Sequence, residues 1–165
     1  RFMDILLSIP QILLAVTIAA ALGPGLLNLT IAVGIANIPS FARVVRGAVL
    51  SIVGQEFIEA AHCMGASDAW IIARHILPNC SAPIIVQATL RVAGAILAAA
   101  ALSFLGLGIQ PPTPEWGGML SAARGYVRDY AYMTISPGLA IMITILALNF
   151  LGDGLRDAMD PKMKR

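Results

Sequence analysis

The sequence predicts an all-α membrane domain, a polytopic bundle of transmembrane helices. Two observations lead to this fold class. Of the 165 residues, 58% are hydrophobic and only 12% are charged, which is about half the charged fraction of a typical soluble domain. Four stretches also approach or exceed the ~20 apolar residues that a helix needs to cross the hydrocarbon core. Because so few residues could coat a water-facing surface, much of the chain must face lipid.

The four predicted spans follow one another along the chain. They run from Phe2 to Leu22, from Leu26 to about Val53, from Pro83 to about Leu107, and from Ser136 to about Leu151. Only Gly23-Pro24-Gly25, a helix-breaking run, separates the first two, so we expect a helical hairpin. Without an internal repeat, residues 1–165 form one membrane domain. The chain enters an apolar span directly after Arg1, so we expect further sequence upstream rather than a signal peptide.

Two polar segments separate the later spans and predict the orientation. Residues 55–79 lie between the second and third spans, and residues 110–133 lie between the third and fourth, on the opposite face. Short loops rich in Lys and Arg stay in the cytoplasm. The face of residues 55–79 collects Arg1, Arg43, Arg46, Arg74, Arg156, Lys162, Lys164 and Arg165, against Arg124 and Arg128 on the other face. Residues 55–79 and the C-terminus are therefore predicted to be cytoplasmic.

Residues 55–79 can form two short helices joined at Gly65. Gly65 is suited to stop the first helix, and Ser67 is placed to cap a second helix that starts at Asp68. Pro78 cannot continue the second helix and, with Pro83, should return the chain to the membrane. The first helix is amphipathic. One side carries Phe57, Ile58, Ala61 and Met64, and the other carries Glu56, Glu59, Ala60 and Cys63. Because a lipid-bound helix usually presents Lys and Arg, this acidic face favours a protein partner.

At these residues the chain resembles a known family. Glu59-Ala60-Ala61, three residues, Gly65, nine residues and then His75-Ile76-Leu77-Pro78 are similar to the EAA loop of ATP-binding-cassette (ABC) importer permeases. The family places Ile at the position of His75. The resemblance implies a MetI-like ABC permease fold in which residues 55–79 couple to an ATPase. The coupling residues that it implies are Glu59, Ala60, Ala61, Gly65, Leu77 and Pro78.

Further motifs resemble the dipeptide/oligopeptide/nickel permeases of the C-subunit kind. They are ALSFLGLG at 101–108, QPPTPEWG at 110–117, and NFLGDGLRD at 149–157 with Asp160-Pro161 after it. The likeness covers the C-terminal portion of such a permease and implies further spans before Arg1. Many relatives carry Glu where this chain has Ala99, so a substrate contact made by that carboxylate would be absent here.

The resemblance also implies a function and partners. It implies an importer subunit of the bacterial inner membrane that forms the path for di- or oligopeptides, with nickel or glutathione as alternative solutes. The implied partners are a homologous permease subunit in a heterodimer, two ABC ATPase subunits and an extracytoplasmic solute-binding protein. ATP hydrolysis would reside in the ATPases, so the chain is predicted to be neither an enzyme nor a cofactor-binding protein.

Candidate residues for the solute path are Arg91, Ser103 and Asn149. Arg91 could face the path or extend to the cytoplasmic interface, since a charge at the bilayer centre is unfavourable. Asn28, Asn37 and Asn149 could line a path, but amides in membrane helices more often bond a neighbouring helix. The Gly and Ala residues at 93–95 and 98–101 permit either tight helix packing or room for a solute.

Other function classes fit the sequence less well. Cys63 and Cys80 lack metal-ligand spacing, and a net charge of +2 is too small to indicate a nucleic-acid partner. His62 and His75 fall in residues 55–79, outside the spans, and we find no paired acids or nucleophile and base for an intramembrane enzyme. A channel or structural subunit remains the distant alternative, although such a protein would have no use for an ATPase-coupling loop.

Overall fold

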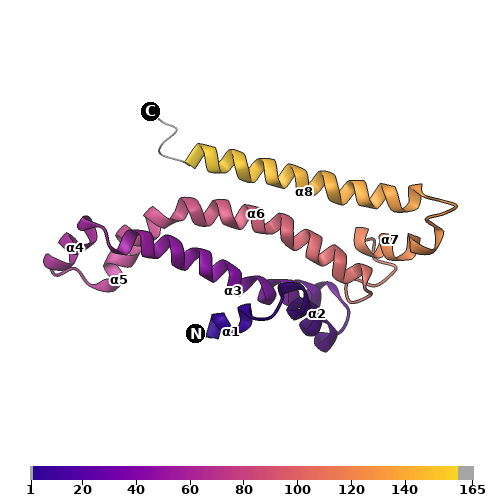
Figure 1. Cartoon of the computed structure of the whole chain (residues 1–165), viewed down its shortest axis with the longest axis horizontal. Coiled ribbons are helices and arrows are strands. Elements are labelled where there is room, and N and C mark those ends of the chain that lie inside the picture. Colours follow the sequence, from indigo (N-terminus) through magenta and orange to yellow (C-terminus); the bar gives the residue numbers. More distant parts are fainter. Residues whose placement is uncertain (1, 160–165) are drawn as a thin grey trace.

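The computed structural model describes residues 2–159, in which helices are the only regular secondary structure. Three long helices lie side by side: α3 (Leu26–Val53), α6 (Leu77–Phe104) and α8 (Tyr132–Met159). Helix α6 lies between α3 and α8 and contacts both (Figure 1). Each has 28 residues, or about 42 Å of length at 1.5 Å per residue, which exceeds the ~30 Å hydrocarbon core. The predicted all-α fold class is confirmed.

Three helical segments are long and apolar enough to cross a membrane: Leu26–Val53, Asp68–Phe104 and Tyr132–Met159. The first predicted span, Phe2 to Leu22, was wrong as one continuous helix. The structure divides it into α1 (Phe2–Leu7) and α2 (Gln11–Leu22). Pro10, with ψ at 129°, precedes α2, and a proline disfavours the helical conformation in the residue before it. With 12 residues, α2 is about 18 Å long, which is too short to span the core alone.

The predicted hairpin between α2 and α3 is confirmed. Gly23 and Gly25 turn the chain with φ values of +83° and +141°, which non-glycine residues rarely adopt. The Asn28 side chain donates to the Leu22 carbonyl at 2.8 Å and so closes the turn. The Gly25 N–H donates to the Gly108 carbonyl at 3.0 Å, which ties the hairpin turn to the loop after α6.

Small side chains let the helices approach closely where α2, α3 and α6 meet. The buried core there consists of Ala15, Ala19, Leu29, Ala32, Val33, Ala36 and Leu102. On the other side of α6, helix α7 (Trp116–Ala123) rests on the backbone of Ala100, so a side chain at Gly117 would collide with it. Tight packing, one of the two interpretations of the small residues in the third span, therefore applies to Ala93 and Ala100, which are 3% and 7% exposed.

Helix α6 starts earlier than predicted. The sequence placed the start of the third span at Pro83 and a helix end at Pro78, but α5 (Asp68–Ile71) runs through a π-helical turn (Ile72–Ile76) directly into α6. Pro78 lies in the first turn of α6, next to the wider π turn, where the missing N–H and the ring are accommodated. The last span was also predicted too short, because α8 extends it at both ends.

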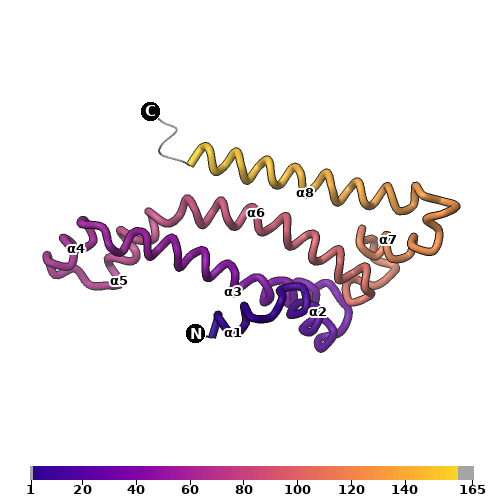
Figure 2. The backbone as a smooth tube through the Cα atoms, viewed as in Figure 1, coloured from indigo at the N-terminus to yellow at the C-terminus, as the bar shows by residue number. Residues whose placement is uncertain are grey.

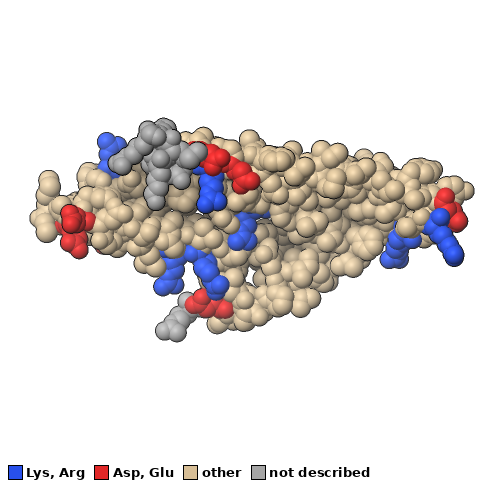
Figure 3. Space-filling view, turned by 45° about the horizontal axis from the view of Figure 1, so that its top comes forward, with Lys and Arg blue, Asp and Glu red and all other residues tan. Residues whose placement is uncertain are grey.

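Charged side chains lie over one half of the surface and at the opposite end of the bundle, with a long apolar stretch between the two groups (Figure 3). The chain reverses at one end through α4 (Glu56–Cys63) and α5, and at the other through α7 (Figure 2). Arg124 and Arg128 follow α7, whereas Arg74 and Arg156 lie at the end of α4 and α5, where α8 also finishes (Figure 1). The predicted basic residues Arg1, Lys162, Lys164 and Arg165 and the Asp160-Pro161 motif lie outside the described residues.

Candidate functional site

Residues 55–76 form a helix-glycine-helix unit at one end of the bundle, here called the elbow (Figure 1). Gly65 has a φ of +81°. Its N–H donates to the His62 carbonyl at 2.9 Å, and the Ala66 N–H donates to the Ala61 carbonyl at 3.1 Å. These two bonds are the Schellman motif that ends a helix. Ser67 Oγ accepts from the Trp70 N–H at 3.4 Å. The predicted helix stop and helix cap are confirmed.

The elbow has a hydrophobic core of its own. Its buried members come from α3, α4, α5, the π-helical turn and the start of α6, and they are Ile52, Ile58, Ala61, Ile71, Ile76 and Cys80. Ile58 is only 2% exposed. One side of α4 is thus fixed against the ends of two long helices, which leaves the opposite side of α4 open to a partner.

The exposed side of the elbow is both acidic and apolar. Glu59 and Ala60 are exposed, and Phe57, Met64 and Trp70 are 40%, 87% and 51% exposed. The sequence placed Phe57 and Met64 on the same side as Ile58 and Ala61, and of these four only Ile58 and Ala61 are buried. Ile58 and Ala61 alone fill the covered strip of this short helix, and Phe57 and Met64 flank it. Exposed apolar side chains that cluster in this way mark interaction surfaces.

His75, which departs from the family pattern, packs among aromatic rings. Its ring centroid lies 4.9 Å from that of Trp70, edge to face, and 6.0 Å from that of Phe57. His75 is therefore half-buried and takes part in packing. His62 Nδ1 lies 3.9 Å from Asp68 Oδ1 across the Gly65 turn, a surface distance at which such a pair contributes little.

The residues implied to couple to an ATPase occupy three environments. Glu59 and Ala60 face solvent, while Ala61 is 9% exposed within the elbow core. Gly65 makes the turn between the helices. Leu77 is 58% exposed and, with Pro78, opens α6. The structure brings all six into the elbow or its junction with α6, and their role in coupling stays a prediction.

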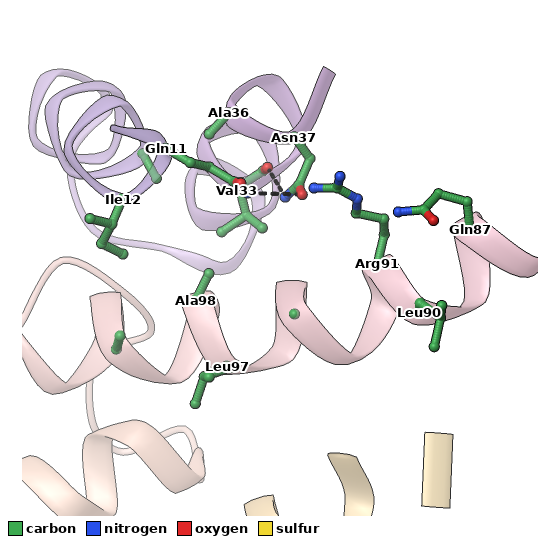
Figure 4. Close-up of a pocket in the computed structure, with 13 residues that line it drawn as sticks. Gln11, Ile12, Val33, Ala36, Asn37, Gln87, Leu90, Arg91, Leu97 and Ala98 are labelled. Carbon is green, nitrogen blue, oxygen red and sulfur yellow. Dashed lines mark hydrogen bonds between the residues drawn. The ribbon is translucent and has the colours of Figure 1, made fainter. Parts of the chain in front are cut away.

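A second polar feature lies among the long helices. Arg91 Nη1 on α6 donates to Ser40 Oγ on α3 at 2.8 Å. On the neighbouring α2, Gln11 Nε2 donates to Asn37 Oδ1 at 2.9 Å, and Asn37 Nδ2 donates to the Val33 carbonyl at 2.8 Å (Figure 4). The prediction that Asn37 bonds a neighbouring helix is confirmed. These bonds link three helices around Arg91, whose charge would cost about 2.5–3.5 kcal/mol if it lay at the bilayer centre.

Three members of this network, Gln11, Asn37 and Arg91, line a cavity of about 600 Å³ between α2, α3 and α6, here called the Arg91 cavity. A second cavity of about 620 Å³ shares Val33, Asn37 and Arg91 with it. Both volumes lie in the ~300–1,000 Å³ range of ligand pockets. Gly94 and Ala98 also line the Arg91 cavity. The small residues of the third span therefore allow tight packing at Ala93 and Ala100 and leave space at Gly94 and Ala98, while passage of a solute through that space stays a prediction.

The other two candidates for the solute path lie elsewhere. Ser103 is 3% exposed and packed beneath Gly108, where any side chain at residue 108 would collide with it. Asn149 lines an apolar cavity of about 800 Å³ between α6, α7 and α8. The structure does not bring Arg91, Ser103 and Asn149 together, and their part in a solute path stays a prediction.

Sequence reasoning missed Gln11 and Ser40. Both are isolated polar residues within apolar stretches, and this isolation was the sequence feature that could have identified them. Their partners are 26 and 51 residues away in the chain, so the pairing depends on how the helices pack.

The family of the chain can be established by comparison. Residues 1–165 match the family described as binding-protein-dependent transport system inner membrane component. The chain belongs to this family. The resemblance to ABC importer permeases is thereby confirmed, and the three candidate spans agree with an inner-membrane protein that crosses the bilayer several times.

Individual relatives show which permeases within the family the chain is similar to. The chain is 51% identical to the di/tripeptide transport system permease protein DppC of Pseudomonas aeruginosa and 54% identical to the dipeptide transport system permease protein DppC of Alkalihalophilus pseudofirmus. It is 53% identical to the glutathione transport system permease protein GsiD of Escherichia coli. Each match covers 99% of this chain and 54% of the relative. The chain thus spans about half the length of the curated relatives it matches.

Proposed function

We propose that this permease belongs to an ABC importer of di- or oligopeptides, in which the bundle lines the solute path and the elbow couples to an ATPase. The observation that carries this proposal is the construction of the elbow. Ile58 and the rest of the elbow core fix it to the ends of α3 and α6, while Phe57, Met64 and Trp70 are left exposed. A partner that grips the exposed side therefore acts on two membrane helices at once.

The proposed assembly contains a homologous permease subunit as heterodimeric partner, two ATPase subunits and an extracytoplasmic solute-binding protein that meets residues 110–133. In this assembly the elbow and the end of α8 face the cytoplasm. Arg74 and Arg156 near that end support this orientation, since basic residues favour the cytoplasmic side. Arg124 and Arg128, which follow α7 at the opposite end, count against it. A fourth crossing would be made by α1 and α2 together.

In the proposed mechanism the chemistry belongs to the ATPases. ATP binding closes the two ATPases, and each elbow moves with the ATPase that holds it. Because α5 continues through Ile72–Ile76 into α6 without a break, the movement passes directly into the bundle. The path alternates between inward-open and outward-open states. Only a nucleotide or solute with different affinities for the two states can drive that change.

The charge of Glu59 provides the main test. The acidic side of the elbow requires a basic groove on the ATPase, so Glu59→Lys in the intact subunit places like charges together, which costs several kcal/mol. We expect association with the co-expressed ATPases and ATP-dependent uptake of dialanine to fall by about tenfold or more. Glu56→Lys makes the same charge change on the same exposed helix outside the motif, and we expect a smaller effect. If both variants associate like the parent protein, the coupling assignment is wrong.

Glutathione is the second candidate solute, because the chain is 53% identical to a glutathione permease subunit. The purified complex, with its solute-binding protein, separates the candidates. Stimulation of ATP hydrolysis by dialanine, and not by glutathione, would support the peptide assignment, and the reverse would replace it. A complex that moves solute without hydrolysing ATP would indicate a channel.

A further inference from the structure

Arg91 lies in the middle of α6, about 20 Å from either end of that helix at 1.5 Å per residue. Its Nη1 donates to Ser40, but its Nε is shielded from solvent and has no hydrogen-bond partner. Within residues 2–159, no carboxylate pairs with Arg91. The guanidinium therefore keeps unused donors and an uncompensated positive charge in the apolar part of the bundle.

The surroundings of Arg91 supply amide groups and space rather than a counter-charge. Figure 4 shows the guanidinium extending from α6 towards Asn37 on α3, with the Gln87 amide beside it. Gln11 approaches from α2 and is held by Asn37. Gly94 and Ala98, without bulky side chains, leave the adjoining volume of about 600 Å³ open.

We propose that the Arg91 cavity is a binding site for the carboxylate of the transported solute, which for a peptide is its C-terminal group. This inference rests on the proposed function. A guanidinium has five N–H donors in a planar fork that matches the two oxygens of a carboxylate. One Nη1 donor is engaged with Ser40, and the remaining Nη1 and Nη2 donors can bind a carboxylate through strong charge-assisted bonds. The side-chain amides of Gln87 and Asn37 can donate further hydrogen bonds to the carboxylate.

A different role for Arg91 has to be separated from this one. The bond to Ser40 could serve only to join α3 to α6. A joining role predicts that Ser40→Ala, which removes the bond, and Arg91→Gln, which removes the charge, harm transport of every solute equally. A carboxylate site predicts that Arg91→Gln acts selectively on solutes that carry a carboxylate.

The experiment compares uptake of dialanine with uptake of its C-terminal amide. The complete importer is reconstituted in liposomes with parent subunit, Arg91→Gln, Ser40→Ala or Arg46→Gln. Arg46→Gln is the matched control, because it makes the same charge change at an exposed position on α3 outside the cavity. The same solute-binding protein is used throughout, so its own preference cancels when the acid-to-amide ratios of the variants are compared.

We expect Arg91→Gln to lower the acid-to-amide uptake ratio by about tenfold, in line with the loss of hydrogen bonds to a charged group, and to change amide uptake less than twofold. The ratio should stay within twofold of the parent for Ser40→Ala and Arg46→Gln. An unchanged ratio in Arg91→Gln, or an equal fall for both peptides, overturns the carboxylate site. ATP-driven uptake that persists in any of these variants leaves the proposed importer function intact, so the two proposals fail separately.

Discussion

The elbow and the Arg91 cavity both involve α6, but they are built over very different distances along the chain. The helices and turn of the elbow come from one run of about twenty residues, with local hydrogen bonds at Gly65 and Ser67. The Arg91 cavity joins α2, α3 and α6 through pairs separated by 26 and 51 residues. The elbow also has a separate hydrophobic core. We therefore expect variants in one region to leave the other intact.

The largest expected effect comes from Ile58→Ala in the elbow core. Ile58 is 2% exposed, and truncation of a buried Ile to Ala costs about 2–5 kcal/mol. Hydrogen exchange of the α4 amides should accelerate strongly, while protection of α8 stays as in the parent. Phe57→Ala, on the same turn but 40% exposed, is the control and should keep the protection of α4. Equal loss of protection in α4 and α8 would show that the two regions are not independent.

Gly65→Val should have the next largest effect. Gly65 holds a φ of +81°, and no atom lies within 4 Å of the point that a Cβ would occupy, so the strain would come from the backbone alone. This conformation costs a non-glycine residue about 1–2 kcal/mol. Protection of α4 should fall, and so should association with the ATPases of the proposed assembly. Gly65→Asn should be milder, because Asn adopts this conformation more readily. If the Gly65→Val and Gly65→Asn variants lose protection and association to the same extent, backbone strain at the turn is not the cause of the loss.

Asn37→Ala tests the region of the Arg91 cavity. It removes the bond from Gln11, and hydrogen bonds between membrane helices contribute about 0.6 kcal/mol on average. Denaturant unfolding in mixed micelles should show a loss of this order with unchanged protection of α4. Thr30→Ala is the control, since that hydroxyl bonds only within α3, to the Leu26 carbonyl. A loss of elbow protection in Asn37→Ala would contradict the separation of the two regions.

His62→Ala should have the smallest effect. The His62 and Asp68 side chains are 52% and 88% exposed, with 3.9 Å between their nearest atoms. Exposed pairs of this kind contribute less than about 1 kcal/mol, so protection of α4 should change little. Asp68→Ala should match it. Melting of the elbow in either variant would show that the pair, rather than Ile58 and the Gly65 turn, holds the two helices together.

The comparison also explains what could be predicted from the sequence. The helix stop at Gly65, the cap at Ser67 and the start of the second helix at Asp68 were predicted because each depends on residues within a few positions. The burial of the α4 side chains could not be predicted in this way. Over two turns, residue spacing shows which side chains share a side but not how wide a strip the neighbouring helices cover, so it could not show that Phe57 and Met64 stay exposed beside the buried Ile58.

Prolines account for the errors in the first and third spans. Pro10 separates two helices, whereas Pro78 lies inside a continuous helical segment beside a π-helical turn. Their intrinsic chemistry is the same, and the difference arises from the adjoining structure. The Arg91 network was beyond prediction for a related reason. Arg91 was recognised as unusual, but Ser40 became its partner only through the packing of α3 on α6.

The bond between Gly25 and Gly108 has a consequence for how this protein can move. It fastens α3 to the end of α6 at one extremity of the bundle, and the elbow core fastens the same two helices at the other extremity. Because α3 and α6 are joined at both extremities, we expect them to move together. In the proposed importer, a switch of the path from one side of the membrane to the other is then expected at the borders of this helix pair, against α8 or the proposed companion subunit.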